Sequence, residues 1–164
     1  MTPGPTPAAA TAVFRKAREA DAPACATIYR DARRAAFHWE DRDYGLEEFA
    51  GSTYGEALWV AEAVGPDTGP DGITDGSAGI LAFASVWRAP EYWFLHNLFV
   101  APAWQGRGIG SALLREVLAA IGRPVELKTD TPNTAARRLY ERFGFQVVEE
   151  DTAAPTPWFK MRLE

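Results

Sequence analysis

The sequence predicts an α+β domain in which helices pack on a mostly antiparallel sheet. Its 164 residues suffice for one domain, and no linker or internal repeat divides them. The proportions of hydrophobic residues (47%) and charged residues (24%) are typical of a globular protein. Apolar spacing predicts the order strand, one or two helices, three strands, helix, strand, helix, two strands. We therefore expect a single domain over residues 12–164, built on six or seven strands.

The composition argues against several classes of protein. A net charge of −5 does not favour nucleic-acid binding, and no apolar run approaches the roughly 20 residues that span a bilayer. Cys25 is the only cysteine, which excludes an internal disulfide and a metal site built from several cysteines. Residues 1–11 show neither periodicity nor a signal-peptide pattern. We expect a disordered tail there, a cytoplasmic protein, and no metal, nucleic acid or membrane among its partners.

The first part of the domain predicts a strand followed by helices. Residues 12–18 alternate sufficiently for a strand. Asp21 is a candidate N-cap, and the helical spacing of apolar residues after it predicts a helix over 22–37. Cys25 lies in this helix and is expected to be a small buried residue. The acidic and aromatic segment 39–54 predicts a short helix with loops.

The rest of the chain predicts strands separated by clear turns and two further helices. Residues 65–77 are almost all turn residues and predict a loose hairpin connection. A helix over 110–121 has Leu113, Val117 and Ile121 in one apolar row, and Gly122 ends it. The other predicted elements are strands over 58–64, 78–87, 92–100 and 125–130, a helix over 133–143, and strands over 145–150 and 158–163.

A glycine-rich loop, residues 105–110 (QGRGIG), joins the strand at 92–100 to the helix at 110–121. Its glycines let a ligand approach the main chain closely, and the helix N-terminus offers free N–H groups to an anion. Arg107 adds a guanidinium that matches phosphate oxygens. A Walker A loop is excluded because Ser111 and Ala112 stand where Lys and Ser or Thr are required, and the dinucleotide fingerprint lacks its third glycine.

This loop resembles the Q/R-x-x-G-x-G/A motif of the GNAT superfamily of N-acetyltransferases. Downstream, Asn133, Ala136, Tyr140 and the pair Gly144-Phe145 are spaced like the family's second cofactor segment. The order of elements also matches the family over most of the chain. The resemblance implies a mixed, mostly antiparallel sheet flanked by helices and splayed between the strands at 92–100 and 125–130.

In such a fold acetyl-CoA enters the opening between the splayed strands. The resemblance implies that the backbone of 98–100 pairs with the pantetheine amides, that 105–110 holds the diphosphate, and that charged residues of the last helix lie near the phosphates. The implied cofactor-binding residues are Leu98, Phe99, Val100, Gln105, Gly106, Arg107, Gly108, Ile109, Gly110, Asn133, Ala136 and Arg138. Arg137 and Arg142 either lie near the CoA phosphates as well or belong to a solvated helix face.

Tyr140 stands where the family often places the general acid that protonates the departing thiolate. The alternative is a core aromatic on the apolar face of the last helix. Many relatives carry a glutamate base on the fourth strand, but this chain has Phe94 there. His96 lies two residues further on, hence on the same face, and is interpreted either as the base or a water relay, or as a structural residue. His38 and Glu91 are weaker candidates.

The expected activity is acetyl-CoA-dependent N-acetylation of a primary amine on a small molecule or peptide, by direct attack through a tetrahedral intermediate. Acidic and aromatic residues over 39–49 either bind a cationic amine or form a solvated helix face. Trp87, Trp93 and Phe94 either line an apolar pocket or belong to the core. Two alternatives stay open: a non-catalytic acyl-CoA-binding sensor of the same fold, and a nucleotide-phosphate binding module. The sequence leaves open the acceptor, the acyl-chain preference and whether the protein forms a homodimer.

Overall fold

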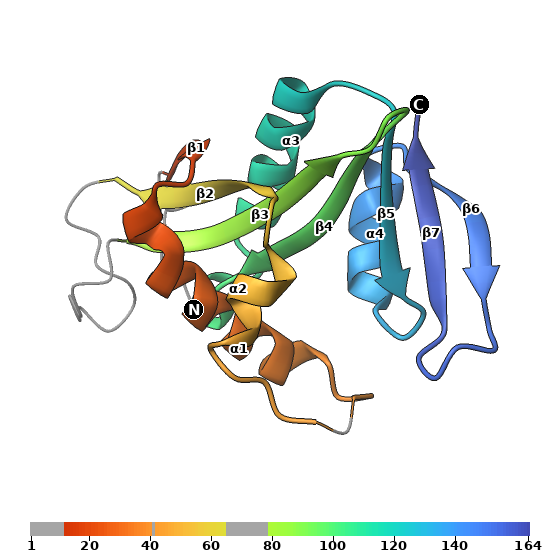
Figure 1. Cartoon of the computed structure of the whole chain (residues 1–164), viewed down its shortest axis with the longest axis horizontal. Coiled ribbons are helices and arrows are strands. Elements are labelled where there is room, and N and C mark those ends of the chain that lie inside the picture. The colour runs from red at the N-terminus through yellow and green to blue at the C-terminus, as the bar shows by residue number, and fades with distance from the viewer. Residues whose placement is uncertain (1–11, 41, 65–78) are drawn as a thin grey trace, which may run out of the picture.

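The computed structural model describes residues 12–40, 42–64 and 79–164, and the predicted tail over 1–11 and the hairpin connection over 65–77 lie outside them. Seven strands form one sheet in the order β1-β2-β3-β4-β5-β7-β6 (Figure 1). The strands are β1 (Ala12–Lys16), β2 (Ala57–Ala63), β3 (Ile80–Arg88), β4 (Trp93–Val100), β5 (Val125–Asp130), β6 (Gln146–Asp151) and β7 (Trp158–Leu163). The helices are α1 (Ala22–Ala36), α2 (Glu48–Ser52), α3 (Ile109–Ile121) and α4 (Thr134–Arg142), with 3₁₀ turns at Glu19–Asp21 and Pro102–Trp104.

The sheet is mixed because β4 and β5 run parallel while all its other neighbouring strands run antiparallel. The parallel pairing joins Trp93 to Val125, Phe94 to Glu126 and Leu95 to Leu127, and it stops there. Beyond these pairs the two strands diverge, as Figure 1 shows. The predicted fold class, including the splay between β4 and β5, is confirmed.

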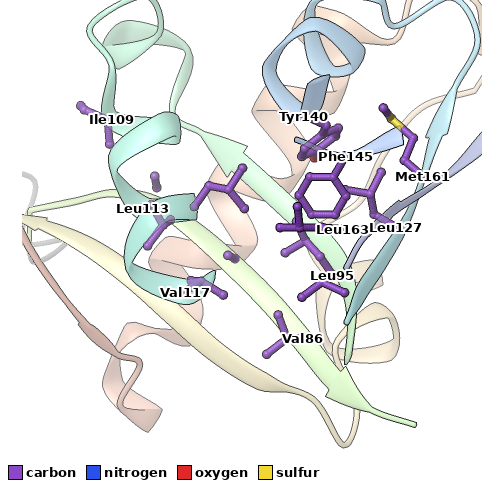
Figure 2. Close-up of a cluster of buried hydrophobic side chains, with 14 of the residues drawn as sticks. Val86, Leu95, Ile109, Leu113, Val117, Leu127, Tyr140, Phe145, Met161 and Leu163 are labelled. Carbon is purple, nitrogen blue, oxygen red and sulfur yellow. The ribbon is translucent and has the colours of Figure 1, made fainter. Parts of the chain in front are cut away.

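Helices cover both faces of the sheet. On one face Leu113, Leu114 and Val117 of α3 are fully buried against β3 and β4, together with side chains of β5 and β7 (Figure 2). On the opposite face α1 buries Cys25 and Ile28 against a second cluster. α3 and α1 therefore cover opposite faces of the half of the sheet that contains β3 and β4. The strand pairing between this half and the other is confined to the three residue pairs of β4 and β5.

Asp21 occupies the predicted N-cap position of α1, but its carboxylate binds Arg15 and Arg18 and does not cap the helix. No capping bond forms from its side chain. Instead Asp21 is 4% exposed and accepts two hydrogen bonds from the Arg15 guanidinium, at 2.7 and 3.1 Å, and one from the Arg18 backbone N–H at 2.7 Å. This contact ties the start of α1 to β1, and the chain leaves β1 at Lys16.

Candidate active site

Two cavities, of about 240 and 550 Å³, open where β4 and β5 diverge. The larger one lies between the end of β4, the start of α3 and α4, and the smaller one reaches β5 and the end of α1. Residues that line both cavities are Phe37, Leu98, Phe99, Asn133, Ala136 and Tyr140. The two spaces thus meet beside Tyr140, in the opening that the parallel strand pair creates.

The glycine-rich loop lines the larger cavity. Gly106 and Gly108 have φ values of 76° and 80°, and no neighbouring heavy atom lies within 4 Å of the position that a Cβ would take on either. Gly108 is also the N-cap of α3, so the free N–H groups of the first turn start here. A Cβ on Gly110 would lie 3.2 Å from Val100 Cγ2, so the absence of a side chain at Gly110 lets α3 begin close to β4. The loop therefore presents bare backbone and a helix N-terminus to the cavity, the arrangement that binds phosphate groups.

The predicted basic residues are placed differently from one another. Arg142 lines the larger cavity, whereas Arg107 and Arg138 are not among its lining residues. The Arg107 guanidinium lies over the Trp104 ring, 4.6 Å from its centroid, and Arg138 is exposed on α4. Arg137 pairs with Glu141 at 2.8 Å. Of these four arginines, Arg142 is thus the one that the geometry brings to the cavity, and the phosphate-binding roles of Arg107 and Arg138 stay predictions.

Two predicted cofactor residues also make local hydrogen bonds. Asn133 caps α4, since its Oδ1 accepts the Ala136 N–H at 3.2 Å. Gln105 donates from Nε2 to the Val100 carbonyl oxygen at 3.1 Å. Both bonds fix the edges of the cavity: the first sets the start of α4, and the second holds the glycine-rich loop against the end of β4.

Tyr140 lies in the last turn of α4 and is 9% exposed. Its ring packs edge-on against Phe145, with centroids 5.7 Å apart, in the core region that Figure 2 shows beside β4 and β5. Burial raises the pKa of the Tyr140 hydroxyl well above its ordinary value. The phenol is protonated at neutral pH, as an ordinary tyrosine is, and burial moves its pKa further from neutrality.

His96 lines the smaller cavity with Tyr140. The register of β3 with β4 shifts here, because Ser85 pairs with Asn97 and Val86 with Leu95, so His96 has no partner opposite it. Bulges of this kind re-aim a side chain and occur often beside active sites. The His96 and Phe94 rings are 6.3 Å apart, and Phe94 packs on Trp87 at 5.4 Å.

The sequence analysis missed Glu56, which precedes β2. Its Oε1 lies 2.6 Å from His96 Nδ1, and its side chain is 8% exposed. No sequence signal marks this contact, because the two residues are 40 positions apart and belong to different elements. Among the weaker base candidates, Glu91 is exposed ahead of β4, at the paired end of the strands, and His38 is not among the lining residues of either cavity.

The smaller cavity carries charges of both signs. Arg33, Glu40, Lys128 and Asp130 line the smaller cavity. The Arg33 guanidinium packs over the rings of several aromatic residues and lies 3.7 Å from Glu40. Trp39 Nε1 donates to Asp130 Oδ2 at 3.0 Å, which connects the segment after α1 to the end of β5.

Much of the acidic segment that the sequence suggested as a wall for a cationic amine is neutralised by arginines. Asp43 pairs with Arg34 at 2.8 Å, and Glu48 pairs with Arg42. These pairs lie at the surface, where both partners are partly exposed. Glu40 is the acidic residue that the structure brings to the smaller cavity from the described part of this segment. The smaller cavity is therefore lined by charges of both signs, which are positive at Arg33 and Lys128 and negative at Glu40 and Asp130.

The described residues contain no group of three or more His, Cys, Asp or Glu side chains placed to hold a metal ion. Within the same part of the chain, no helix is both long and apolar enough to cross a membrane.

The fold is that of known acetyltransferases. The ribosomal-protein-S18-alanine N-acetyltransferase of Escherichia coli superposes with a TM-score of 0.66 at 20% identity, covering 93% of each chain. NAA60 of Arabidopsis thaliana, solved with a bisubstrate analogue, gives a TM-score of 0.63 at 21% identity, covering 93% of this chain and 97% of that one.

Sequence comparison gives the family. The model of the acetyltransferase (GNAT) family matches residues 22–145, so the chain belongs to this family. The chain is also similar to the N-alpha-acetyltransferase RimI of Mycobacterium tuberculosis (strain ATCC 25618 / H37Rv), with 46% identity over 79 residues. That match covers 47% of this chain, and the chain spans about half the length of this curated relative (48%).

Proposed function

We propose that this enzyme transfers the acetyl group of acetyl-CoA to a primary amine, using Tyr140 as the general acid and His96 as the base. One observation carries the proposal: Tyr140 lines both the cavity of the glycine-rich loop and the cavity that contains His96. An acyl donor in the first cavity and an amine in the second meet beside its hydroxyl. That is the geometry that a direct transfer between two substrates requires.

The larger cavity fits the shape and charge of acetyl-CoA. The diphosphate is assigned to the bare backbone of 105–110 and the first turn of α3, with Arg142 at the rim. The pantetheine arm is assigned to the space between the backbone of 98–100 and the start of α4, where Asn133 and Ala136 line the wall. The thioester then lies towards Tyr140.

The chemistry needs one proton removed and one supplied. The amine attacks the thioester carbonyl directly, and His96, or a water that it holds, takes the amine proton. The tetrahedral intermediate then releases the CoA sulfur, which takes the proton of the Tyr140 hydroxyl. A tyrosine phenol has an ordinary pKa of about 10 and is protonated at neutral pH, and burial raises the Tyr140 pKa further, so the acid is in the correct form when the sulfur leaves.

For the acceptor we propose the α-amine of a peptide N-terminus as the first choice and a small-molecule amine as the second. The likeness to an N-alpha-acetyltransferase over about half of the chain supports the first choice. The mixed charges of Arg33, Glu40, Lys128 and Asp130 suit an acceptor that carries carbonyl or carboxylate groups near its amine.

The experiment is a thiol-release assay with acetyl-CoA against peptides with different N-terminal residues, including alanine, and against polyamines, aminoglycosides and free amino acids. We expect release of CoA with at least one class of primary amine, and the acetylated product by mass spectrometry. If acetyl-CoA binds but no acceptor is turned over, the activity proposal fails and a non-catalytic acyl-CoA sensor remains. Tight binding of ATP in place of CoA would instead indicate a nucleotide-phosphate module.

A further inference from the structure

Glu56 and His96 form a hydrogen-bonded pair at the smaller cavity, which His96 lines. Glu56 lies between α2 and β2, and its Oε1 is 2.6 Å from His96 Nδ1. The Glu56 side chain is 8% exposed, whereas His96 is 43% exposed. The other carboxylate oxygen, Oε2, is buried and has no hydrogen-bond partner in the part of the chain that the structure describes.

This pair is a poor device for stabilising the fold. A buried carboxylate loses hydration, and the loss is compensated only when several donors satisfy its oxygens. Asp21 in the same chain shows such a satisfied site, with donors from Arg15 and Arg18. Within the described residues the Glu56 carboxylate makes one side-chain hydrogen bond, and its partner is the imidazole that lines the smaller cavity. Its position is therefore explained better by an effect on His96 than by stability.

The contact decides which ring nitrogen of His96 is free. A glutamate carboxylate has only lone pairs to offer, so the hydrogen between the two groups belongs to Nδ1. The neutral imidazole then carries its hydrogen on Nδ1, and Nε2 keeps a lone pair. The bulge in β4 leaves this ring outside the regular side-chain alternation of the strand, and the ring lines the cavity beside Tyr140.

We propose that Glu56 is a positioning residue that holds His96 in the Nδ1–H tautomer, so that Nε2 accepts the proton of the attacking amine. This inference rests on the proposed role of His96 as the base. In the step, the amine lone pair forms the new N–C bond and the amine proton moves to Nε2, while Nδ1–H stays bonded to Glu56. The C–S bond then breaks, its electron pair stays on sulfur, and sulfur takes the Tyr140 proton. Water returns a proton to Tyr140 and removes the one on Nε2, so the products are the amide and free CoA thiol.

The tautomer can be measured without any turnover. The chain has two histidines, His38 and His96, so nitrogen spectra of ¹⁵N-histidine-labelled protein are simple to assign with a His38→Gln variant. At mildly alkaline pH we expect the Nδ1 signal of His96 to be that of a protonated nitrogen and the Nε2 signal that of an unprotonated one. In Glu56→Ala we expect the ring to shift towards the Nε2–H form, and in Glu56→Gln to keep the native form, because the amide oxygen still accepts from Nδ1.

Kinetics supply the second readout. Glu56→Ala is expected to lower kcat by about 10- to 100-fold, a part of the ~10²–10⁴-fold that acid–base catalysis contributes, with little change in the KM for acetyl-CoA. Glu56→Gln should recover part of this loss. The matched control is Glu126→Ala, which removes another largely buried carboxylate, one that is 13% exposed and paired with Arg162. It should leave both the tautomer and kcat unchanged.

Two outcomes separate this inference from the proposed function. The positioning role of Glu56 is overturned if the His96 tautomer is unchanged in folded Glu56→Ala. It is also overturned if Glu56→Gln has the Nε2–H tautomer and yet keeps the full wild-type kcat. A wild-type rate in His96→Gln overturns the assignment of the base, whatever the tautomer. Because Glu56→Gln is close to isosteric, the test remains decisive if Glu56→Ala does not fold.

Discussion

Tyr140 is the residue on which the proposed reaction depends most. Tyr140→Phe removes one oxygen atom and keeps the ring packed on Phe145. We expect kcat to fall by ~10²-fold or more with little change in acetyl-CoA binding, because the hydroxyl acts only when sulfur leaves. The measurement is the single-turnover rate, which excludes masking by product release.

The control for this variant is Tyr29→Phe. Tyr29 is 4% exposed and lies in the cluster under α1, outside the lining of both cavities. The Tyr29→Phe variant should keep the wild-type single-turnover rate. A Tyr140→Phe enzyme that acetylates as fast as this control would show that Tyr140 only fills space.

Cys25 provides a test of burial on α1. Burial raises the pKa of its thiol to about 12, so the native thiol should not react with a thiol reagent at neutral pH until the protein is unfolded. The thiol ionises from about pH 8.5 in the unfolded chain but stays protonated in the folded protein. Above pH 8.5 this difference should lower the free energy of unfolding by up to about 1.4 kcal/mol per pH unit. Urea unfolding over this range should show a shallower decline for Cys25→Ala. Equal slopes would mean that the native thiol is not shielded.

At the scale of elements, the loop before α3 decides cofactor binding. Gly108→Ala places a methyl group on backbone with φ of 80°, where the cavity is open. We expect the affinity for CoA to fall by about tenfold or more, or about 1.4 kcal/mol, measured by titration calorimetry.

Gly122→Ala is the matched variant at the other end of α3. Gly122 also has a φ of 80°, and no neighbouring heavy atom lies within 4 Å of its missing Cβ. The Gly122→Ala protein should lose stability from backbone strain but keep its affinity for CoA. Equal losses of affinity in both variants would trace the effect to α3 stability and not to contact with the diphosphate.

The junction of β1 with α1 depends on Asp21. Its hydrogen bonds from Arg15 hold the pKa of the Asp21 carboxyl below its ordinary value. The stabilisation is therefore present above the unfolded-state value of about 3.9 and is lost as the pH falls through the folded-state value. Asp21→Asn should cost about 1.5–3 kcal/mol at neutral pH and flatten the acid side of the stability curve. If urea unfolding shows the same acid dependence for both proteins, the Arg15–Asp21 pair does not stabilise the junction.

For the whole molecule, the ligand should strengthen a sheet whose halves meet at one end. Acetyl-CoA that binds only the folded protein at about 100 times its Kd should stabilise it by about 2.7 kcal/mol. We expect a concentration-dependent rise in Tm with acetyl-CoA and a smaller rise with acetyl-pantetheine, which lacks the diphosphate. An equal rise with ATP would contradict the assignment of the larger cavity to CoA.

Features whose contacts are local in the chain could be predicted from the sequence. The loop 105–110 and α3 follow one another directly, so the glycines, the helix start and the anion site are readable as one segment. The apolar periods of α3 and α4 likewise predicted which faces are buried. The mixed sheet and its splay came from the resemblance, and the three-residue pairing of β4 with β5 confirmed them.

The surroundings of the proposed reacting groups, in contrast, depend on how distant segments pack together. Glu56 meets His96 across 40 positions, and Trp39 meets Asp130 across 91, because side chains from separate elements come together when the sheet and helices pack. The bulge at His96 arises from the register of two strands, which no single segment encodes. The pairing of acidic residues with arginines has the same origin. A sequence gives the charge of each residue, and the fold decides which charges neutralise one another.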